Sequence, residues 1–208
     1  MKKSLILLTL LIALVLPSAR AQIAKGEKYL GGYISFYSQN SDNDNGYEQN
    51  TTSLALSPRL GFGLGKSWVV GPVAGYSWQK QHYESGGVGD AKTNFFTGGV
   101  FVRKFFSLNN NLGFFADGQI DYGGGSNESR NETNGTVTES KYKDERFSVG
   151  IRPGLYAKAT KKLLFEATMG NIGYIISSST PDGGVKSTNK TFQASLTNSV
   201  SFGVALIW

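Results

Sequence analysis

The residues that could support catalysis gather around a single histidine. His82 is the only histidine of the chain, and Glu84 and Ser85 follow it closely. Histidine, a carboxylate and a hydroxyl are the groups from which enzymes build a general base and a nucleophile. The chain has no cysteine, and it lacks the sequence patterns of zinc peptidases, serine hydrolases and nucleotide-binding loops. We therefore expect no metal or other cofactor, and His82 is the sharpest candidate for catalysis.

Five further charged residues stand alone within segments that are otherwise apolar or small. They are Arg59, Asp117, Asp121, Arg152 and Glu166. These positive and negative groups have the signs needed for ion pairs, and isolated charges away from water are costly unless they are paired. They therefore predict a charge network inside the fold, provided that the elements that carry them turn their side chains to a common interior.

Those elements are expected to be β-strands. From Glu27 onward, segments rich in Tyr, Phe, Val, Ile and Thr are separated by clusters of Gly, Asn, Asp and Ser, and helical periodicity is scarce. The pattern predicts eight strands: Lys28 to Ser38, Thr51 to Phe62, Trp68 to Tyr83, Thr93 to Phe106, Leu112 to Gly123, Lys141 to Ala157, Leu163 to Ser177 and Thr191 to Trp208. Apolar and polar residues alternate with a period of two, most clearly from Phe192 to Trp208, so each strand has one apolar face.

The connections between these strands predict two different rims. Three are short: Gly63 to Ser67, Ser107 to Asn111 and Lys158 to Lys162. Four are longer and polar: Gln39 to Asn50, Glu84 to Lys92, Gly124 to Ser140 and Ser178 to Lys190. Short and long connections alternate, so they lie on opposite rims, and an even strand number puts both termini at the short rim, as in outer-membrane barrels. We expect an all-β fold, an eight-stranded antiparallel up-and-down transmembrane β-barrel with long extracellular loops.

The N-terminus predicts export. Two lysines precede an apolar run from Leu5 to Leu16, and a small-residue cleavage pattern follows at Ala19 to Ala21, as in secretory signal peptides. We expect cleavage after Ala21, so that residues 1–21 are the signal peptide and residues 22–208 form one barrel domain in the outer membrane. The signal peptide carries three positive charges and no acidic residue. Its loss lowers the formal charge from +6 to +3 and removes the main support for nucleic-acid binding.

Alternation alone does not decide which face meets lipid, because a soluble barrel can turn its apolar face inward. The expected strands meet or exceed the roughly 9 to 11 residues needed to cross a bilayer. Their polar face consists mostly of Gly, Ser, Thr and isolated charges, which suit a narrow lumen. Trp68, Trp78, Tyr122 and Trp208 stand near strand ends, where aromatic rings match the lipid headgroups. A membrane barrel is favoured, and a soluble exported barrel that binds a small apolar ligand stays open as an alternative.

Three prolines and one change of parity predict irregularities in the barrel wall. Pro58, Pro72 and Pro153 fall inside strands, where a missing backbone donor requires a bulge or a bend. Near Gly170 and Asn171 the apolar residues of the seventh strand change parity. A bulge there would keep the apolar set of that strand facing lipid.

The whole pattern resembles the OmpA/OmpX-type small outer-membrane barrels, including the outer membrane protein β-barrel domain proteins of Bacteroidetes-like bacteria. The resemblance is architectural, and its most specific part is the C-terminal set Phe202, Val204, Leu206 and Trp208. This set is similar to the aromatic signal that the barrel-assembly machinery reads, although many such barrels end in Phe. The resemblance implies that machinery and periplasmic chaperones as partners during biogenesis, and lipid and lipopolysaccharide as surroundings.

The expected position of His82, at the outer end of a strand, is where lipid A-modifying barrel enzymes place their catalytic groups. A deacylase of the PagL type is similar in size and topology, but its H-x-S order is absent because Glu84 occupies the third place. The leading hypothesis is therefore a non-catalytic outer-membrane barrel whose loops serve envelope integrity, adhesion or recognition of an extracellular partner. Its lumen would be plugged by side chains, since eight strands leave little room. A lipid A-modifying enzyme that uses His82 is the alternative.

Overall fold

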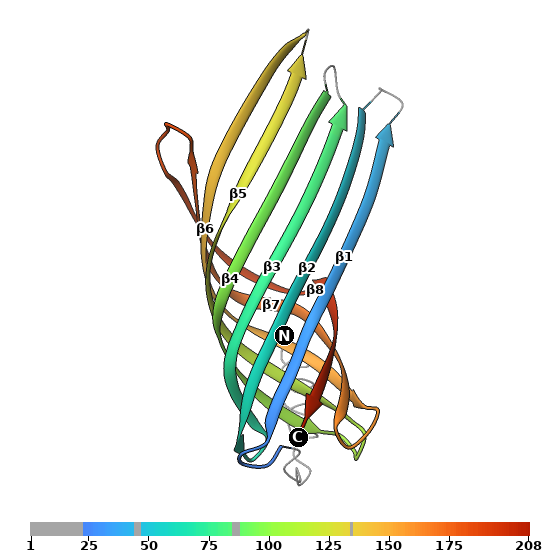
Figure 1. Cartoon of the computed structure of the whole chain (residues 1–208). Coiled ribbons are helices and arrows are strands. Elements are labelled where there is room, and N and C mark those ends of the chain that lie inside the picture. The colour runs from blue at the N-terminus through green and yellow to red at the C-terminus, as the bar shows by residue number, and fades with distance from the viewer. Residues whose placement is uncertain (1–22, 44–46, 85–87, 134) are drawn as a thin grey trace, which may run out of the picture.

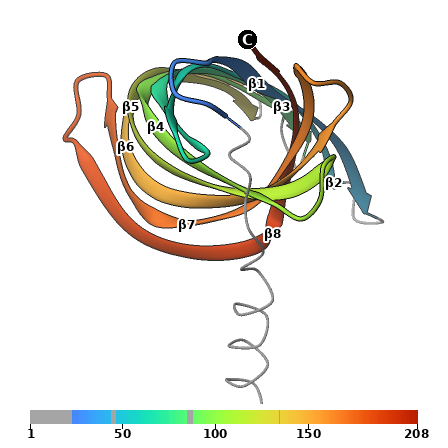
Figure 2. The ribbon, with the colours of Figure 1, turned by 90° about the horizontal axis from the view of Figure 1, so that it is seen from below.

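The computed structural model describes residues 23–43, 47–84, 88–133 and 135–208. They form antiparallel strands that follow one another around a closed barrel, as Figures 1 and 2 show from the side and from below. The strands are β1 (Lys28–Asn43), β2 (Tyr47–Gly65), β3 (Trp68–Glu84), β4 (Val88–Ser107), β5 (Leu112–Thr133), β6 (Thr136–Lys158), β7 (Leu163–Pro181) and β8 (Ser187–Ile207). No helix long and apolar enough to cross a membrane occurs in the described ranges. The expected fold class is confirmed.

The two rims of the barrel carry different connections. The turn rim, at the bottom of Figure 1, carries the connections 66–67, 108–111 and 159–162 and the C-terminus. The hairpin rim, on the opposite side, carries the connections 44–46, 85–87, 134–135 and 182–186. The lumen is therefore described below as a lower half, next to the turn rim, and an upper half, next to the hairpin rim.

The prediction of four long loops at the hairpin rim is wrong. The segment from Gly124 to Ser140 continues β5 and β6, whose pairing ends only at Thr133 opposite Thr136. Its polar residues pair across the hairpin, with Glu128 opposite Lys141, so strand pairing persists although the composition is that of a loop. The described residues within 38–52, 79–93, 124–145 and 177–190 are called the hairpin arms.

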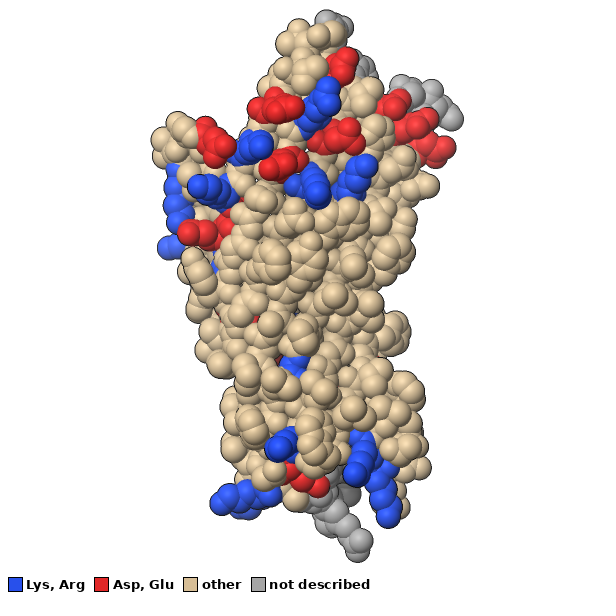
Figure 3. All heavy atoms as spheres, viewed as in Figure 1, with Lys and Arg blue, Asp and Glu red and all other residues tan. Residues whose placement is uncertain are grey.

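Outward-facing side chains are apolar over the lower part of the wall. Ile34, Leu60, Phe96, Ile151 and Phe202 are between 53% and 68% exposed although they are large and apolar. Figure 3 shows a belt on this face that is almost entirely uncharged, apart from a small charged patch near its centre, with most charged residues gathered above and below it. A broad apolar belt of this kind fits a lipid surrounding and is rare on proteins in water. The apolar faces point outward, opposite to the arrangement of the soluble alternative.

Aromatic side chains mark both edges of this belt. Trp68 and Trp208 are exposed at the turn rim, and Tyr122 is exposed where the apolar part of β5 ends. Trp78 is half-buried on β3, two residues before Lys80. Trp78 and Tyr122 thus lie in mid-strand and not near strand ends, because the strands continue into the hairpin arms. Amphipathic rings at these two levels match the headgroup regions of a bilayer.

A register shift occurs at two of the four places where the sequence predicts a bulge or a bend. The register between β7 and β8 shifts between Met169 and Asn171, and Gly170 between them has a φ of 65°. The register between β6 and β7 shifts next to Pro153. No shift occurs at Pro58 or Pro72; instead, pairing between β2 and β3 is interrupted around them. A local gap in one ladder accommodates a proline there without an extra residue.

The ring closes over a short stretch. Pairing of β1 with β8 runs from Tyr29 opposite Ile207 to Ile34 opposite Phe202. Within the described residues, the upper part of β1 pairs with β2 alone and the upper part of β8 with β7 alone. The β7–β8 arm consequently leans away from the other arms in Figure 1.

The lower lumen is filled by aromatic side chains. Tyr29, Phe101, Phe105, Phe115 and Tyr156 are at most 2% exposed and belong to one buried cluster. The ring centroids of Phe105 lie 5.3 Å from Tyr156 and 6.0 Å from Phe115, within the range of favourable ring contacts. Phe115 breaks the simple alternation of its strand because it fills the interior.

Candidate functional site

A layer of charged side chains lies above the aromatic cluster in the lower lumen. Its members come from β2, β4, β5 and β7 and are at most 3% exposed: Arg59, Arg103, Asp117 and Glu166. They face inward because they stand at even spacing from inward aromatic neighbours, as Arg103 does between Phe101 and Phe105. Equal numbers of positive and negative groups make the layer neutral.

Arg103 lies at the centre of this charged layer. Its Nε and Nη2 donate to the Asp117 carboxylate at 2.5 and 2.8 Å, and its Nη1 donates to Glu166 at 2.6 Å. Arg59 donates to Asp117 at 2.5 Å and to the Gln119 side-chain oxygen at 2.7 Å. Asp117 therefore joins two guanidinium groups, and both carboxylates of the layer have a cationic partner.

Two tyrosines complete the hydrogen bonding around Glu166. The hydroxyls of Tyr29 and Tyr33 donate to its carboxylate at 3.0 and 2.7 Å, and they accept from Arg103 at 2.8 and 2.7 Å. The Arg103 guanidinium also lies 3.9 Å from the centroid of the Phe115 ring. Buried charges persist only when they are paired and hydrogen-bonded. In this layer Arg59 Nε alone, among the described residues, is buried without a hydrogen-bond partner. This layer is thus suited to closing the lumen and to holding four strands together.

A second, looser charge pair lies above the layer. Arg152 Nη2 lies 3.7 Å from Asp121, and the two side chains are 32% and 10% exposed. Asp121 also accepts hydrogen bonds from Gln119 at 2.6 Å and from Ser148 at 3.2 Å. Gln119 links this pair to Arg59.

The structure thus brings all five sequence-predicted charges into one lumen, but in two groups. Arg59, Asp117 and Glu166 belong to the charged layer, and Asp121 pairs with Arg152 above it. The cation of Glu166 is Arg103, which sequence reasoning missed. Arg103 could have been found from its position two residues from both Phe101 and Phe105, because residues two apart on a strand share a face. The adjacent Lys104 obscured this pattern, since two consecutive basic residues look like an exposed strand end.

Above Asp121 the lumen is open. A cavity of about 330 Å³ is bounded below by Gln119, Asp121 and Arg152, and it continues into a second of about 450 Å³. Both cavities share Ser77, Phe95 and Arg146 as lining residues, so together they form one vestibule. The Arg146 guanidinium lies 4.5 Å from the centroid of the Phe95 ring.

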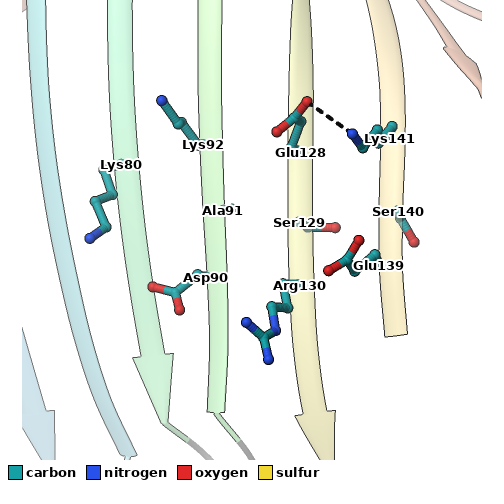
Figure 4. A pocket seen from close by; sticks show the side chains of 10 residues that line it. All are labelled: Lys80, Asp90, Ala91, Lys92, Glu128, Ser129, Arg130, Glu139, Ser140 and Lys141. Carbon is teal, nitrogen blue, oxygen red and sulfur yellow. Dashed lines mark ion pairs between the residues drawn. The ribbon is translucent and has the colours of Figure 1, made fainter. Parts of the chain in front are cut away.

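The outer face of the hairpin arms carries charges in two cross-strand rows. The first row above the apolar belt runs across β3, β4, β5 and β6 as Lys80, Lys92, Glu128 and Lys141. The second row runs across the same strands as His82, Asp90, Arg130 and Glu139. Figure 4 shows most of these side chains around a shallow pocket of about 370 Å³, with the ion pair between Glu128 and Lys141 at 3.5 Å.

His82 lies at the end of the second row and contacts two carboxylates. Its Nδ1 lies 3.0 Å from Asp90 and its Nε2 lies 3.3 Å from Glu84. Hydrogen bonds to Asp90 first, and then to Glu84, raise the pKa of His82 above its ordinary value. The neighbouring Ser85 lies outside the described residues, and in the described part of the chain no cluster of acidic or histidine side chains could hold a metal ion.

Comparison with known families assigns the chain. Residues 29–172, from β1 into β7, match the family model described as the autotransporter β-domain. The chain belongs to this family. It is an outer-membrane β-barrel protein, in agreement with its apolar belt. Membership of the OmpA/OmpX-type barrels and an origin in Bacteroidetes-like bacteria are not confirmed.

Solved structures similar to this autotransporter β-domain barrel have low sequence identity. A major outer membrane protein from Thermus thermophilus is 13% identical, with a TM-score of 0.48, over 88% of this chain and 99% of that one. Neisserial surface protein A is 12% identical, with a TM-score of 0.36, over 86% and 94%. The attachment invasion locus protein Ail of Yersinia pestis is 11% identical, with a TM-score of 0.36, over 88% and 95%. No curated protein matches the chain.

The C-terminal residues of this barrel face lipid. Phe202, Val204, Leu206 and Trp208 are between 44% and 68% exposed, on the outer face of the wall. Their role as an assembly signal stays a prediction. The predicted signal peptide lies outside the described residues, which begin at Ile23, buried against the turn rim beside Gly63.

Proposed function

We propose that this chain is a non-catalytic outer-membrane barrel that is closed at its turn rim and presents its hairpin arms as an ordered recognition surface outside the cell. The observation that carries the proposal is the change along the outer face of the strands. Side chains change from apolar to charged between Trp78 and Lys80, while the strands themselves continue without interruption. An ordered sheet with charges at fixed spacing suits the recognition of a partner.

The first row of charges faces the level of the lipid headgroups. Lys80 stands directly opposite Lys92, one step beyond the pair of Trp78 and Asn94 on the same face. Like charges directly opposite one another weaken a sheet unless an anion lies between them. Phosphate groups of outer-membrane lipid, lipopolysaccharide among them, are the anions nearest to this position. This row therefore suits phosphorylated lipid as a partner.

The second row suits a different role. Asp90, Arg130 and Glu139 alternate in sign across the sheet, and His82 contacts Asp90. Charges of alternating sign compensate one another, so this row needs no bound anion. It stiffens the outer sheet and leaves both nitrogens of His82 occupied by carboxylates, which favours a surface ion pair over catalysis at His82.

The charged layer and the aromatic cluster favour a lumen that is closed to passage. Arg59, Arg103 and Asp117 have almost no exposed surface, and the Phe101 and Phe115 rings lie beside them. An eight-stranded barrel leaves an interior that side chains can fill completely. Transport through the lower lumen would require these ion pairs to break.

Shortening one hairpin arm tests whether the lower barrel inserts into the membrane without the arms. Gly125 and Asp144 are cross-strand partners, so a two-residue Asn-Gly turn between them can replace residues 126–143. We expect the shortened chain to enter the outer membrane and to keep a heat-modifiable migration on gels, because the belt and the lumen layers are intact. Failure of this variant to insert would contradict the proposal.

Charge reversal tests the lipid partner. The double variant Lys80→Glu, Lys92→Glu should reduce the lipopolysaccharide that copurifies with the barrel severalfold, because both changes place carboxylates beside lipid phosphates. The matched control is Lys161→Glu, Lys162→Glu, which reverses two exposed lysines at the turn rim. Equal losses in both variants, or no loss in either, would rule out the first row as the lipid contact.

A further inference from the structure

The turn rim carries almost only positive charges. Among the described residues of this rim, the one acidic side chain outside the lumen is Glu27, whose carboxylate accepts a hydrogen bond from the backbone nitrogen of Ala24 at 2.7 Å. The lysines at the rim are Lys25, Lys28, Lys66, Lys104, Lys158, Lys161 and Lys162. Figure 3 shows positive side chains gathered at the lower end of the molecule around a small acidic patch. The rim therefore has a surplus of positive charge.

The lysines of the two rims differ in their partners. In the described ranges, the lysines that form ion pairs are Lys141 with Glu128 and Lys186 with Glu145, and both pairs belong to the hairpin arms. The lysines of the turn rim have no acidic side chain to pair with there. A cationic surface that is not compensated from within the protein attracts anions.

Two of the turn-rim lysines stand directly opposite tryptophans. Lys104 is the cross-strand partner of Trp68, and its Nζ lies 5.0 Å from the centroid of the Trp68 ring. Lys28 and Trp208 exchange two backbone hydrogen bonds, at 2.7 and 3.1 Å, and are therefore opposite one another as well. Trp68 and Trp208 are 41% and 49% exposed on the outer face of the wall. The same lysine–tryptophan pair thus occurs twice at the lower edge of the apolar belt.

The apolar belt begins directly above both pairs. Leu30 and Val102 stand two residues above Lys28 and Lys104 on the same strand faces, and each is 40% exposed. Tryptophan rings lie at the headgroup level of a bilayer, and lysine side chains extend from that level toward the phosphates. An anion that fits here therefore has its charge at the rim and an apolar part beside the belt, as a phospholipid has.

We propose that the turn rim binds anionic phospholipid of the periplasmic leaflet. The headgroup phosphates lie against the ammonium groups of Lys28 and Lys104, and the acyl chains lie along Leu30 and Val102. The other lysines of the rim strengthen the attraction to an anionic membrane surface. The choice of the periplasmic leaflet rests on the proposed function, which places the hairpin arms outside the cell. The lipid class follows from the rim itself.

Fluorescence of the turn-rim tryptophans tests the proposal. The chain has three tryptophans, so Trp78→Phe leaves Trp68 and Trp208 as reporters. The folded Trp78→Phe barrel is placed in phosphatidylcholine bilayers that contain either brominated phosphatidylglycerol or brominated phosphatidylcholine, which quench tryptophan on contact. We expect phosphatidylglycerol to associate with the rim at least about threefold more strongly than phosphatidylcholine, and this preference should fall as salt is raised.

Lysine variants in the same background locate the contact. Lys28→Gln, Lys104→Gln should reduce the preference to about one, because the headgroup phosphates lose both ammonium groups. The matched control Lys186→Gln, Lys190→Gln removes two exposed lysines from the hairpin arms and should leave the preference unchanged. Heat-modifiable migration shows that each variant is folded.

Three results overturn the proposal. They are equal quenching by the two lipids, a preference that survives Lys28→Gln, Lys104→Gln, and cosedimentation with peptidoglycan in the absence of any lipid preference, which would assign the rim to the cell wall. These bilayers have the same lipids in both leaflets, so the result does not depend on which rim faces outward in the cell. A lipid preference at a turn rim that proves accessible from outside the cell would contradict the proposed function and leave the lipid class standing.

Discussion

The lower and upper halves of the lumen are built from the same strands, yet one is filled and the other is open. In the lower half, inward glycines lie under large rings: a Cβ on Gly154 would lie 2.2 Å from the Phe115 ring, and one on Gly113 would lie 2.3 Å from the Tyr156 hydroxyl. In the upper half, inward positions such as Ser77 and Ser148 carry small polar side chains. Strand geometry therefore fixes the width of the lumen, and the volume of the inward side chains decides whether the lumen is filled or open.

The arginines of the two halves also differ in their exposure to water. Arg103 has lost all contact with water and makes hydrogen bonds to four side chains, whereas Arg152 keeps about a third of its side chain exposed. Removing one partner from a buried set leaves an uncompensated charge, while water screens the loss at an exposed site. The difference between the halves therefore predicts very different responses to the same kind of substitution.

The largest expected effect follows from removing Arg103. Arg103→Met should lower the free energy of unfolding by about 3 to 5 kcal/mol, because Asp117 and Glu166 lose their shared cation in a buried setting. Arg152→Met should lower it by about 1 kcal/mol or less, because that side chain is partly exposed and its pair with Asp121 is long. Urea unfolding of the folded barrels, followed by heat-modifiable migration, measures both. Equal losses would remove the distinction between the two halves.

A smaller effect follows from adding volume. Gly154→Ala in the lower lumen should destabilise the barrel by about 1 to 3 kcal/mol, because the new methyl group meets the Phe115 ring and the backbone oxygen of Ala167. Ser77→Val adds more volume in the vestibule and should change stability by less than about 0.5 kcal/mol. The same unfolding assay compares the two variants. A larger loss of stability in Ser77→Val than in Gly154→Ala would show that the vestibule is packed.

The smallest effect concerns His82 on the outer face of the arms. Its pKa is raised by Asp90 and Glu84, so its contribution to stability is complete below its ordinary pKa and is lost as the pH rises through the raised value. The NMR titration of this single histidine should have its midpoint above about 6.5 and should move down in Asp90→Asn. A midpoint that Asp90→Asn leaves in place would show that the ion pair does not form.

The period of two predicted the strands, their number and the outward apolar face, because each strand must turn one face to lipid. The parity change at Gly170 predicted its bulge for the same reason. Composition failed at the hairpin rim, since residues such as Asn127 and Ser129 look like loop residues. Their strand state depends on the hairpin that continues beneath them, and that pairing is not visible in a single segment.

The lumen charges were partly visible in the sequence. Asp117 and Asp121 stood out because their strand alternates clearly. The partner choices did not, because pairing depends on register across strands that are far apart in the chain: Arg103 meets Glu166 across 63 residues, and Tyr33 meets it across 133. Tyr29 and Tyr33 were counted only as strand formers, since nothing local indicates that their hydroxyls face a buried carboxylate.

The central claim is that the lumen is open from outside down to Asp121 and closed below it. The chain has no cysteine, so single introduced cysteines can be labelled on intact cells with a membrane-impermeant maleimide. We predict labelling of Ser148→Cys in the vestibule and no labelling of Ala205→Cys in the lower lumen, with Lys161→Cys at the turn rim labelled only after lysis. Labelling of Ala205→Cys, or protection of Ser148→Cys, on intact cells would contradict the account.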